Sequence, residues 1–318
     1  MKAMVITAFG GPEVFKEQDM PKPKPGPNEV LVKIHATSVN PVDFKIRRHG
    51  EWAGLKFPAI LGYDVSGVVE EVGAGVRDFK VGDQVYYTSE ILGVQGCYAE
   101  YHVANERIVA RKPSNLTHVQ AASIPLAGCT AWDSLLTRAQ LKIGETVLIH
   151  AAAGGVGSLA VQIAKIAGAY VFATCAKYNM DLAKSLGADQ VIDYRAEDFV
   201  EVINRETDGQ GVDLVFDTVG GETLAKSIEA TKRHTGRIAT ILGAREDLGP
   251  AFMRDITIHF VFMQRGRQKL DVMRDLIERG QLKPVIDSVM PLRDVAKAHQ
   301  KLEKGGVRGK IVLEMVPK

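Results

Sequence analysis

The sequence predicts an α/β protein with two domains, one rich in short strands and one built on a parallel sheet with helices on both faces. Its 318 residues exceed what a single hydrophobic core usually holds. Residues 1–122 read as short strands separated by Pro and Gly. Residues 123–265 alternate apolar, β-rich runs with helical segments, a pattern typical of a doubly wound parallel sheet.

The first domain is predicted from runs rich in Val, Ile, Thr and Tyr. These runs are AMVITAF, EVLVKIHATSV, VSGVVEEVG, DQVYYT and YAEYHVA. The prolines of residues 21–27, PKPKPGP, exclude a regular strand there and indicate a stiff connector. After a predicted helix over 268–279, the run LKPVIDSVMPL, a helix over 294–304 and the strand GKIVLEM have the texture of the first domain. Residues 266–318 are therefore expected to return to it.

The second domain is predicted from six apolar, β-rich runs that alternate with helical segments. The runs are TVLIH, AYVFATC, QVIDY, VDLVFDTV, GRIATILG and ITIHFVFM. Helices are expected over 157–167 and 180–186. Strands alternating with helices in this way indicate successive βα units of a parallel sheet.

Composition narrows the function classes. Forty Lys and Arg residues nearly balance 38 Asp and Glu residues, for a formal net charge of +2. This balance is compatible with an enzyme or a binding protein. It gives no sign of a nucleic-acid partner. The three cysteines, Cys97, Cys129 and Cys175, are scattered singly, which fits a reducing compartment. The N-terminus lacks an apolar signal-peptide core, and no segment has about 18 uncharged apolar residues. We expect a cytoplasmic protein with no membrane partner.

A glycine-rich turn joins the first strand of the second domain to its helix. In the run AAAGGVGSLAVQIAK, positions Ala152, Gly154 and Gly157 align with the pattern G-x-G-x-x-G. Gly154 would let the backbone approach a pyrophosphate, and Gly157 would let helix and strand pack closely. The free amides at the helix start would face the phosphate charge. The order of strand, turn and helix predicts a dinucleotide-binding fold of the Rossmann type.

The end of the second strand indicates which dinucleotide binds. Fingerprints that bind NAD place a carboxylate there, about 20 residues on, for the ribose 2'-hydroxyl. Here the segment TCAKYN, residues 174–179, offers Lys177 and no carboxylate. Lys177, with hydroxyl help from Thr174, Tyr178 or Tyr194, would attract a 2'-phosphate, so NADPH is the expected cofactor. The alternative interpretation of Lys177 is a solvated lysine at a helix start.

These motifs together resemble the quinone oxidoreductase and ζ-crystallin family of zinc-free medium-chain dehydrogenases/reductases. The segment GETVLIHAAAGGVGSLAVQIAK, residues 144–165, matches that signature position by position, and SVNPVDFKIR, PAILGYDVSGVVEEVG, IPLAGCTAW, LGADQVIDY and VRGKIVLEM are also similar. The resemblance runs nearly from end to end. It implies a GroES-like catalytic domain, a Rossmann cofactor domain and a cleft between them.

The zinc-dependent branch of the superfamily is the nearest rival. The resemblance aligns its ligand positions with Asn40, Tyr63 and a residue near Leu126 in this chain. Tyr and Leu do not replace the soft nitrogen and sulfur donors of zinc, and the four-cysteine structural lobe is missing, so no metal is expected. Without a metal, quinones and α,β-unsaturated carbonyls are the acceptors that suit hydride transfer, because conjugation already activates them.

The candidate catalytic residues follow from the same resemblance. They are Asn40, Asp43, Lys45 and Tyr63. Tyr63 could donate its phenolic hydrogen, and Lys45 could bind the substrate carbonyl or supply a proton if burial lowers its pKa. Structural alternatives stay open for all of them: Asn40 and Asp43 could cap a helix before FKIRR, Lys45 could be solvated, and Tyr63 could simply pack.

The candidate cofactor residues lie in the glycine turn and at the carboxyl ends of strands, where ligands of a parallel sheet gather. They are Thr130, Ala153, Gly154, Gly155, Val156, Gly157, Thr174, Ala176, Lys177, Asn179, Tyr194, Leu242, Gly243, Phe262 and Lys310.

The predicted function is therefore NADPH-dependent reduction of a small quinone or enone by an enzyme of the NADPH:quinone oxidoreductase type. An enoyl-thioester reductase of the same superfamily and a non-catalytic, ζ-crystallin-like NADPH-binding protein are the alternatives. A homodimer joined through the sixth strand of the Rossmann sheet is also expected, because ITIHFVFM is apolar and uncharged enough to be a poor exposed edge.

Overall fold

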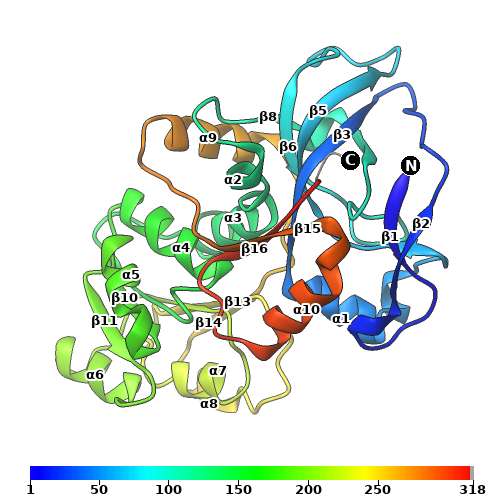
Figure 1. Ribbon diagram of the computed structural model, residues 1–318. Coiled ribbons are helices and arrows are strands. Elements are labelled where there is room, and N and C mark those ends of the chain that lie inside the picture. The colour runs from blue at the N-terminus through cyan, green and yellow to red at the C-terminus, as the bar shows by residue number, and fades with distance from the viewer. Residues whose placement is uncertain (316–318) are drawn as a thin grey trace. The chain divides into compact units, whose positions relative to one another are not determined.

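The computed structural model describes residues 1–315 and divides them into two units. Unit 1 comprises Met1–Leu126, Arg265–Gly280 and the residues from Pro284 on, and unit 2 comprises Ala127–Gln264 with Gln281–Lys283. The α/β fold class expected from the sequence is confirmed, with one mainly antiparallel sheet unit and one parallel sheet unit (Figure 1).

Unit 1 is built on a seven-stranded sheet and a three-stranded sheet. The larger sheet has the order β15-β16-β3-β5-β6-β8, with β7 paired to β3, and the smaller has the order β2-β1-β4. The strands are β1 Lys2–Ile6, β2 Phe15–Asp19, β3 Glu29–Val39, β4 Ala59–Ile60, β5 Asp64–Val72, β6 Gln84–Thr88, β7 Tyr101–Asn105, β8 Ala110–Arg111, β15 Ile286–Pro291 and β16 Lys310–Glu314. Strand β16 pairs antiparallel with β3, so a strand from the end of the chain joins a sheet whose other strands are mostly formed by residues 29–111.

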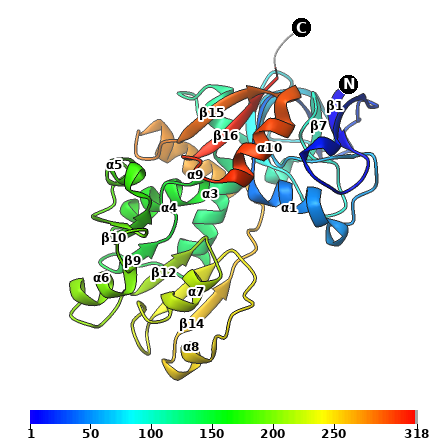
Figure 2. The same cartoon turned by 60° about the horizontal axis from the view of Figure 1, so that its bottom comes forward.

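Four helices belong to unit 1. They are α1 Pro41–His49, α2 His118–Ala122, α9 Arg267–Glu278 and α10 Val295–Lys304. Helix α1 starts directly after β3, and α10 lies beside it in both ribbon views, as their contacts also require (Figures 1 and 2). The apolar core beneath them includes Ile46 of α1, Val295 of α10 and Ile311 of β16.

Unit 2 carries a six-stranded, fully parallel sheet of order β11-β10-β9-β12-β13-β14. Its strands are β9 Thr146–Ile149, β10 Tyr170–Cys175, β11 Gln190–Asp193, β12 Leu214–Asp217, β13 Arg237–Thr240 and β14 Thr257–Phe260. In chain order this is 3-2-1-4-5-6, the strand order of the Rossmann fold, in which ligands bind at the carboxyl ends of the strands where the order reverses.

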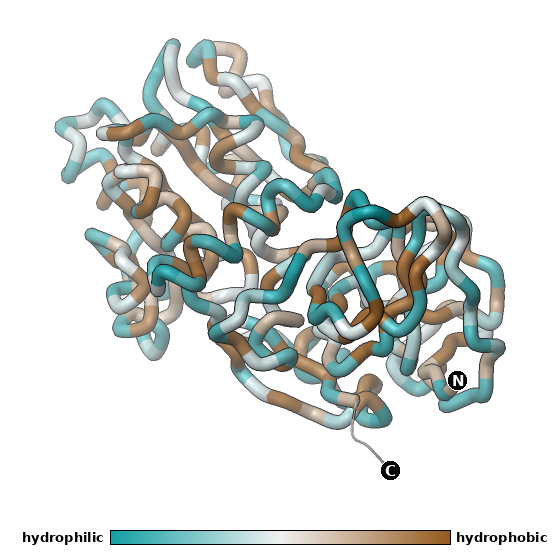
Figure 3. The backbone as a smooth tube through the Cα atoms, turned by 90° about the horizontal axis from the view of Figure 1, so that it is seen from above, coloured by the Kyte–Doolittle hydropathy of each residue, from teal (hydrophilic) through white to brown (hydrophobic). Residues whose placement is uncertain are grey.

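The helices of unit 2 lie before and between these strands in the chain. They are α3 Pro125–Trp132, which begins in unit 1, α4 Gly155–Ile166, α5 Met180–Ser185, α6 Phe199–Glu206, α7 Glu222–Ser227 and α8 Gly249–Met253. Leu148, Phe172, Val215 and Ile238, from four neighbouring strands, form the centre of the core. Apolar stretches run through the inner segments of both units, and hydrophilic stretches lie mostly on outer turns and helix faces (Figure 3).

Among the differences from the sequence-based expectation are three in unit 2. Helix α4 begins at Gly155 rather than residue 157, because Gly154 already takes the extended conformation of an N-cap. The sixth strand is four residues long rather than eight, since its register with β13 covers only Thr257–Phe260. The segment 243–253, for which no element was predicted, ends in α8.

Candidate functional site

The glycine turn of unit 2 lies between the end of β9 and the start of α4. Gly157 lies inside the first turn of α4, where a Cβ atom would come within 2.2 Å of the Ala151 carbonyl oxygen and 2.8 Å of the Ala152 Cα. Only glycine therefore lets the helix approach the turn this closely. This is the packing role that the sequence pattern predicts for the third glycine.

Gly154 differs from Gly157 in what surrounds it. A Cβ at Gly154 would have one neighbour within 4 Å, the Ala151 oxygen at 3.3 Å, so the space beside this residue is open. The turn itself is fixed by hydrogen bonds from Gly154 N–H to the Ala151 carbonyl and from Ala152 N–H to the Thr174 carbonyl of β10. The first amides of α4 have no intrahelical acceptor, so the turn and helix start could hold an anionic group.

The carboxyl ends of β10 and β11 carry a basic and aromatic cluster. Strand pairing places Cys175 opposite Asp193, which brings the residues after each strand together. Lys177 is exposed, and no residue in 1–315 pairs with its ammonium group. The Arg195 guanidinium lies 5.9 Å from the Tyr178 ring centroid and 5.7 Å from that of Tyr194. Arg195 also donates from Nε to the Tyr194 hydroxyl at 3.3 Å.

Arg195 is a functional candidate that the sequence reasoning missed. It follows the third strand directly, and the register between β10 and β11 is what places it near Tyr178. The signal that could have found it was its position beside Tyr194, which the sequence already indicated as a phosphate-side residue.

The remaining predicted cofactor residues are placed as follows. Thr174 is buried, and its hydroxyl pairs with His150 Nδ1 at 3.0 Å, so it faces the protein rather than solvent. Ala153, Ala176, Asn179 and Thr130 are buried, Gly155, Val156 and Leu242 are half-buried, and Gly243 and Phe262 are exposed. The structure brings together the glycine turn residues, and separately Lys177 and Tyr194.

Asp217 is a second residue of unit 2 that sequence reasoning missed. It ends β12 fully buried, accepts the Thr240 hydroxyl at 2.7 Å, and accepts the backbone amides of Val219 and Gly220. These bonds fix the loop after β12, one of the two strands that flank the reversal of strand order. An Asp between an apolar run and a Gly-Gly pair was the available signal.

In unit 1, the predicted residues Asn40 and Lys310 meet around Asp64. Asp64 is fully buried and accepts hydrogen bonds from Asn40 Nδ2 at 2.8 Å, the Ser38 hydroxyl at 2.6 Å and the Leu126 amide at 2.7 Å. The Lys310 ammonium donates to Val39 O at 3.0 Å, to Asn40 Oδ1 and to Asp64 Oδ2 at 3.4 Å. All three ammonium hydrogens thus have protein acceptors, an arrangement that orients Asn40.

Asp43 lies at the start of α1 and is fully buried. Its Oδ2 accepts the Asn40 backbone amide at 2.8 Å, the capping role that was left open as an alternative, and also the Tyr98 hydroxyl at 2.6 Å. Its Oδ1 has no hydrogen-bond partner within residues 1–315. Burial raises the pKa of Asp43 to about 7, although the hydrogen bonds from Tyr98 and Asn40 lower it.

Tyr63 and Lys45 are placed differently from each other. Tyr63 is fully buried with a hydroxyl that has no partner in the described part of the chain, and burial followed by the Asp43 charge raises the pKa of that phenol. Lys45 is on the outer side of α1, because the buried face of that helix carries Asp43, Ile46 and Arg47. Desolvation lowers the pKa of Lys45, although the residue as a whole is exposed.

The positions aligned with zinc ligands do not fit a zinc ion. Both polar atoms of the Asn40 side chain are engaged, Tyr63 is held as a neutral phenol, and Leu126 has no donor atom in its side chain. Within residues 1–315, no three His, Cys, Asp or Glu side chains cluster in a way that could hold a metal ion. Zinc prefers three or four nitrogen, sulfur or carboxylate ligands, which these positions do not supply.

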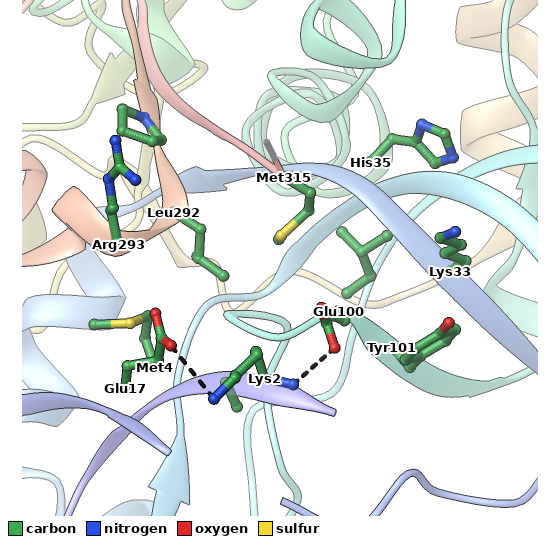
Figure 4. A pocket seen from close by; sticks show the side chains of 13 residues that line it. Lys2, Met4, Glu17, Lys33, His35, Glu100, Tyr101, Leu292, Arg293 and Met315 are labelled. Atoms are coloured by element: carbon green, nitrogen blue, oxygen red, sulfur yellow. Dashed lines mark hydrogen bonds and ion pairs between the residues drawn. The ribbon is translucent and has the colours of Figure 1, made fainter. Parts of the chain in front are cut away.

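A separate pocket of about 520 Å³ lies in unit 1 between β1, β3 and the segment before α10 (Figure 4). Leu292 and Met315 point into it, and Lys33, His35 and Arg293 stand at its edge. None of the site residues expected from the sequence lines it.

Comparison with protein families and with known relatives identifies the class of protein to which this chain belongs. Residues 26–114 match the alcohol dehydrogenase GroES-like domain, and residues 186–313 match a family described as zinc-binding dehydrogenase. The chain is 35% identical to a chloroplast envelope quinone oxidoreductase homolog of Arabidopsis thaliana, over 99% of this chain and 98% of the relative. It is 36% identical to an NADPH-dependent alkenal/one oxidoreductase of the same plant, over 100% of this chain and 80% of the relative.

Solved structures give the same class. A quinone oxidoreductase from Coxiella burnetii matches with a TM-score of 0.90 and 36% identity, covering 99% of both chains. A mycobacterial protein solved with NADPH matches with a TM-score of 0.88 and 31% identity, covering 99% of this chain and 100% of the other.

The chain is an oxidoreductase of the medium-chain dehydrogenase/reductase superfamily that takes a nicotinamide cofactor. Within that superfamily it belongs to the quinone oxidoreductase family, as the sequence motifs indicate. The zinc named in the description of the matched family has no fitting ligand set here, as shown above. In the described residues, none of the helices is both long enough and apolar enough to cross a membrane.

Proposed function

We propose that the protein transfers hydride from NADPH to small quinones or α,β-unsaturated carbonyl compounds. The observation that carries the proposal is the Tyr63 hydroxyl, a buried hydrogen-bond donor without an acceptor in residues 1–315, at a position aligned with a metal ligand. A neutral donor gives modest stabilisation to a developing enolate or phenolate. Conjugated acceptors need no more than that, whereas a simple carbonyl needs a stronger electrophile.

The chain supplies the other parts of this chemistry by binding and orientation. The glycine turn and the start of α4 would hold the pyrophosphate, and the Asp64 and Lys310 pair would hold Asn40 beside the reacting groups. Relatives named for quinone and alkenal/one reduction support these acceptors. NADPH supplies the hydride when bound.

An acceptor panel with NADPH tests the function. Purified protein would be assayed for NADPH consumption with 9,10-phenanthrenequinone, an acrolein-type enal, 2-haloacrylate and crotonyl-CoA. We expect turnover of the quinone or the enal. Activity confined to crotonyl-CoA would favour an enoyl-thioester reductase instead. Tight NADPH binding with no turnover of any acceptor would favour a non-catalytic binding protein.

Preference for NADPH over NADH is proposed to come from Lys177 and Arg195. Lys177 is exposed and unpaired within the described chain, and Arg195 is held between two tyrosine rings at the same strand ends. Two cations at these strand ends suit a 2'-phosphate, which accepts charge-assisted hydrogen bonds. The carboxylate opposite Cys175, that of Asp193, is buried.

Replacing either cation with alanine is expected to weaken NADPH binding by roughly 10- to 100-fold, because each would remove one charge-assisted contact. NADH affinity should change little, since NADH lacks the 2'-phosphate. Fluorescence titration of both nucleotides measures this. Lys184→Ala, an exposed lysine on α5, is the matched control. Equal losses for NADPH and NADH, or no loss for NADPH, would contradict the assignment.

A homodimer is proposed through β14. This strand is the edge of the six-stranded sheet, and Phe260 at its end is 48% exposed. An exposed apolar edge invites pairing with another strand, and a second copy of β14 would continue the sheet. We expect the protein to sediment as a dimer at micromolar concentration and Phe260→Lys to sediment as a monomer.

The matched control for this variant is Ile143→Lys, which adds the same charge at a residue that is 88% exposed and not on β14. A monomeric parent protein, or dissociation by both variants, would count against the β14 interface. The three cysteines are buried and scattered singly along the sequence, which supports a reducing compartment such as the cytosol.

A further inference from the structure

A chain of buried polar side chains in unit 1 ends at Asp43. The Arg47 guanidinium donates to His299 Nδ1 at 3.0 Å, His299 Nε2 lies 3.2 Å from the Tyr98 hydroxyl, and that hydroxyl donates to Asp43 Oδ2 at 2.6 Å. Arg47, Tyr98, His299 and Asp43 are all fully buried. Helices α1 and α10, which supply three of them, lie side by side (Figure 2).

The donor and the acceptor of each hydrogen bond in this series of side chains are determined. Arginine has donors only, so His299 Nδ1 must accept and its proton must be on Nε2. Nε2–H then donates to the Tyr98 oxygen, which leaves the Tyr98 hydrogen to bond to Asp43 Oδ2. Burial and the Arg47 charge lower the pKa of His299 to about 3, in keeping with the neutral imidazole that this arrangement requires.

The same order decides where Asp43 can carry a proton. A proton on Oδ2 would leave the Tyr98 hydroxyl without an acceptor, because His299 Nε2 already carries hydrogen. Losing a buried hydrogen bond in this way is costly. Oδ1 has no partner in residues 1–315, so it is the atom that remains open to a proton.

A simple helix cap does not account for the chain. Capping needs only the bond from Asn40 N–H to Asp43 Oδ2. Arg47 is fully buried and is also held by Glu303 and by the Gly10 carbonyl, so the chain buries a charged group and fixes it from three sides. Burying an arginine costs free energy that better apolar packing would avoid, which points to a role in orienting the carboxyl.

We propose that Arg47, His299 and Tyr98 are positioning residues that hold Asp43 Oδ2 as a permanent acceptor and reserve Oδ1 as the single atom through which this carboxyl exchanges a proton. The proposal rests on the proposed reductase function, in which one proton must accompany each hydride to complete reduction of the acceptor. Tyr63 is one of three buried hydroxyls without a partner among the described residues, with those of Thr37 and Thr88. Of the three, Tyr63 has a titratable phenol that the Asp43 charge acts on, so it is the candidate to share that proton.

Several charged or titratable groups act on Asp43 from the elements around it. They are Tyr63 and Asp64 at the start of β5, Cys97 and Tyr98 before β7, and Lys310 on β16. Arg47 on α1 and His299 on α10 are connected to Asp43 through the Tyr98 hydroxyl. Of these, only Tyr98 donates a side-chain hydrogen bond to the Asp43 carboxyl, so its removal is the direct test.

The experiment compares pH profiles of kcat/KM for a quinone or enal. The limb of the pH profile that disappears in Asp43→Asn is assigned to the titration of the Asp43 carboxyl. In Tyr98→Phe and His299→Leu that limb is expected to move to higher pH, by about one unit for Tyr98→Phe, because the carboxylate loses its charge-assisted donor. In His299→Gln the limb should stay near its original place, because the amide can accept from Arg47 and donate to Tyr98.

Tyr87→Phe is the matched control, since Tyr87 is a buried tyrosine of the same unit whose hydroxyl pairs with His102 at 3.0 Å. Its limb should not move. A uniform loss of kcat/KM at every pH in Tyr98→Phe and His299→Leu, with the limb unchanged, would overturn the proposal and leave the chain as scaffold only.

A second measurement keeps this proposal separate from the proposed function. Carbon-13 NMR titration of the Asp43 carboxyl, assigned with Asp43→Asn, should give a higher midpoint in Tyr98→Phe than in the parent protein whether or not any acceptor is reduced. Absence of turnover with an upward shift would reject the reductase function alone. An unchanged midpoint would reject the proposed positioning role of Arg47, His299 and Tyr98.

Discussion

The protein is expected to unfold cooperatively as the pH falls from 6.5 to about 4. His102, His150 and His299 are buried and neutral, and burial lowers their pKa values to about 4, 4 and 3. In an unfolded chain a histidine has a pKa near 6.5, so the unfolded state binds more protons across this window. The stability these residues contribute is therefore present above pH 6.5 and lost below it.

The size of the effect is large. A shift of this extent corresponds to roughly 3 kcal/mol for each histidine, against a total stability of about 5–15 kcal/mol for a typical protein. His102 and His299 belong to unit 1 and His150 to unit 2, so both units should lose stability. Asp43 opposes them, because its raised pKa makes its contribution decline as pH rises from about 4 through 7, but it is one group against three.

Urea unfolding followed by circular dichroism at half-unit steps between pH 7.5 and 4.5 measures this dependence. His102→Gln should flatten the slope, and His49→Gln, at an exposed residue, should leave it unchanged. A free energy of unfolding that stays constant from pH 7 to 4.5 would rule out the explanation.

Gly157→Ala is expected to destabilise the protein by about 2–4 kcal/mol. The added methyl group would meet the Ala151 carbonyl oxygen at 2.2 Å and the Ala152 Cα at 2.8 Å, both backbone atoms that cannot move without shifting α4 from β9. Urea denaturation of the ligand-free protein measures the loss.

Gly154→Ala should have the opposite profile. Its methyl group has only the Ala151 oxygen at 3.3 Å as a neighbour, so stability without ligand should change little. The methyl would occupy the open side of the glycine turn, and NADPH affinity should fall at least about tenfold, because the backbone can no longer approach the pyrophosphate. Gly266→Ala, whose methyl would meet only Lys269 Cε at 3.8 Å, is the control for both measurements. Unchanged NADPH affinity in Gly154→Ala would show that this glycine does not serve the ligand, and a stability loss equal to that of Gly157→Ala would show that it serves packing instead.

The sequence predicted what is local and repetitive. Periodicity and the Gly154 and Gly157 pattern identified the parallel sheet, its turn and its helix, because those features depend on neighbouring residues. Helix α4 begins two residues before the predicted start, because the sequence pattern does not show that Gly154 takes the extended conformation of an N-cap. Arg195 was missed because its contact with Tyr178 depends on the register between β10 and β11.

The polar interior of unit 1 lay beyond sequence reasoning for a different reason. Asp64 and Lys310 are 246 positions apart, and Arg47 and His299 are 252 apart. A single sequence contains no signal for such pairs, so the hydrogen bonds of the Lys310 ammonium to protein oxygens could not be predicted. Asp43 and Asn40 were within reach because a helix cap is a local pattern.

The late arrival of β16 in the sheet of unit 1 has a consequence for biosynthesis. All six parallel strands of unit 2 leave the ribosome before β15 and β16, so that unit can fold while translation continues. Strand β3, which is made much earlier, must wait for β16 to pair with its last residues and for Lys310 to bind Asp64. Nascent chains stalled between these two events would expose an unfinished sheet, and an unpaired strand edge of this kind favours aggregation.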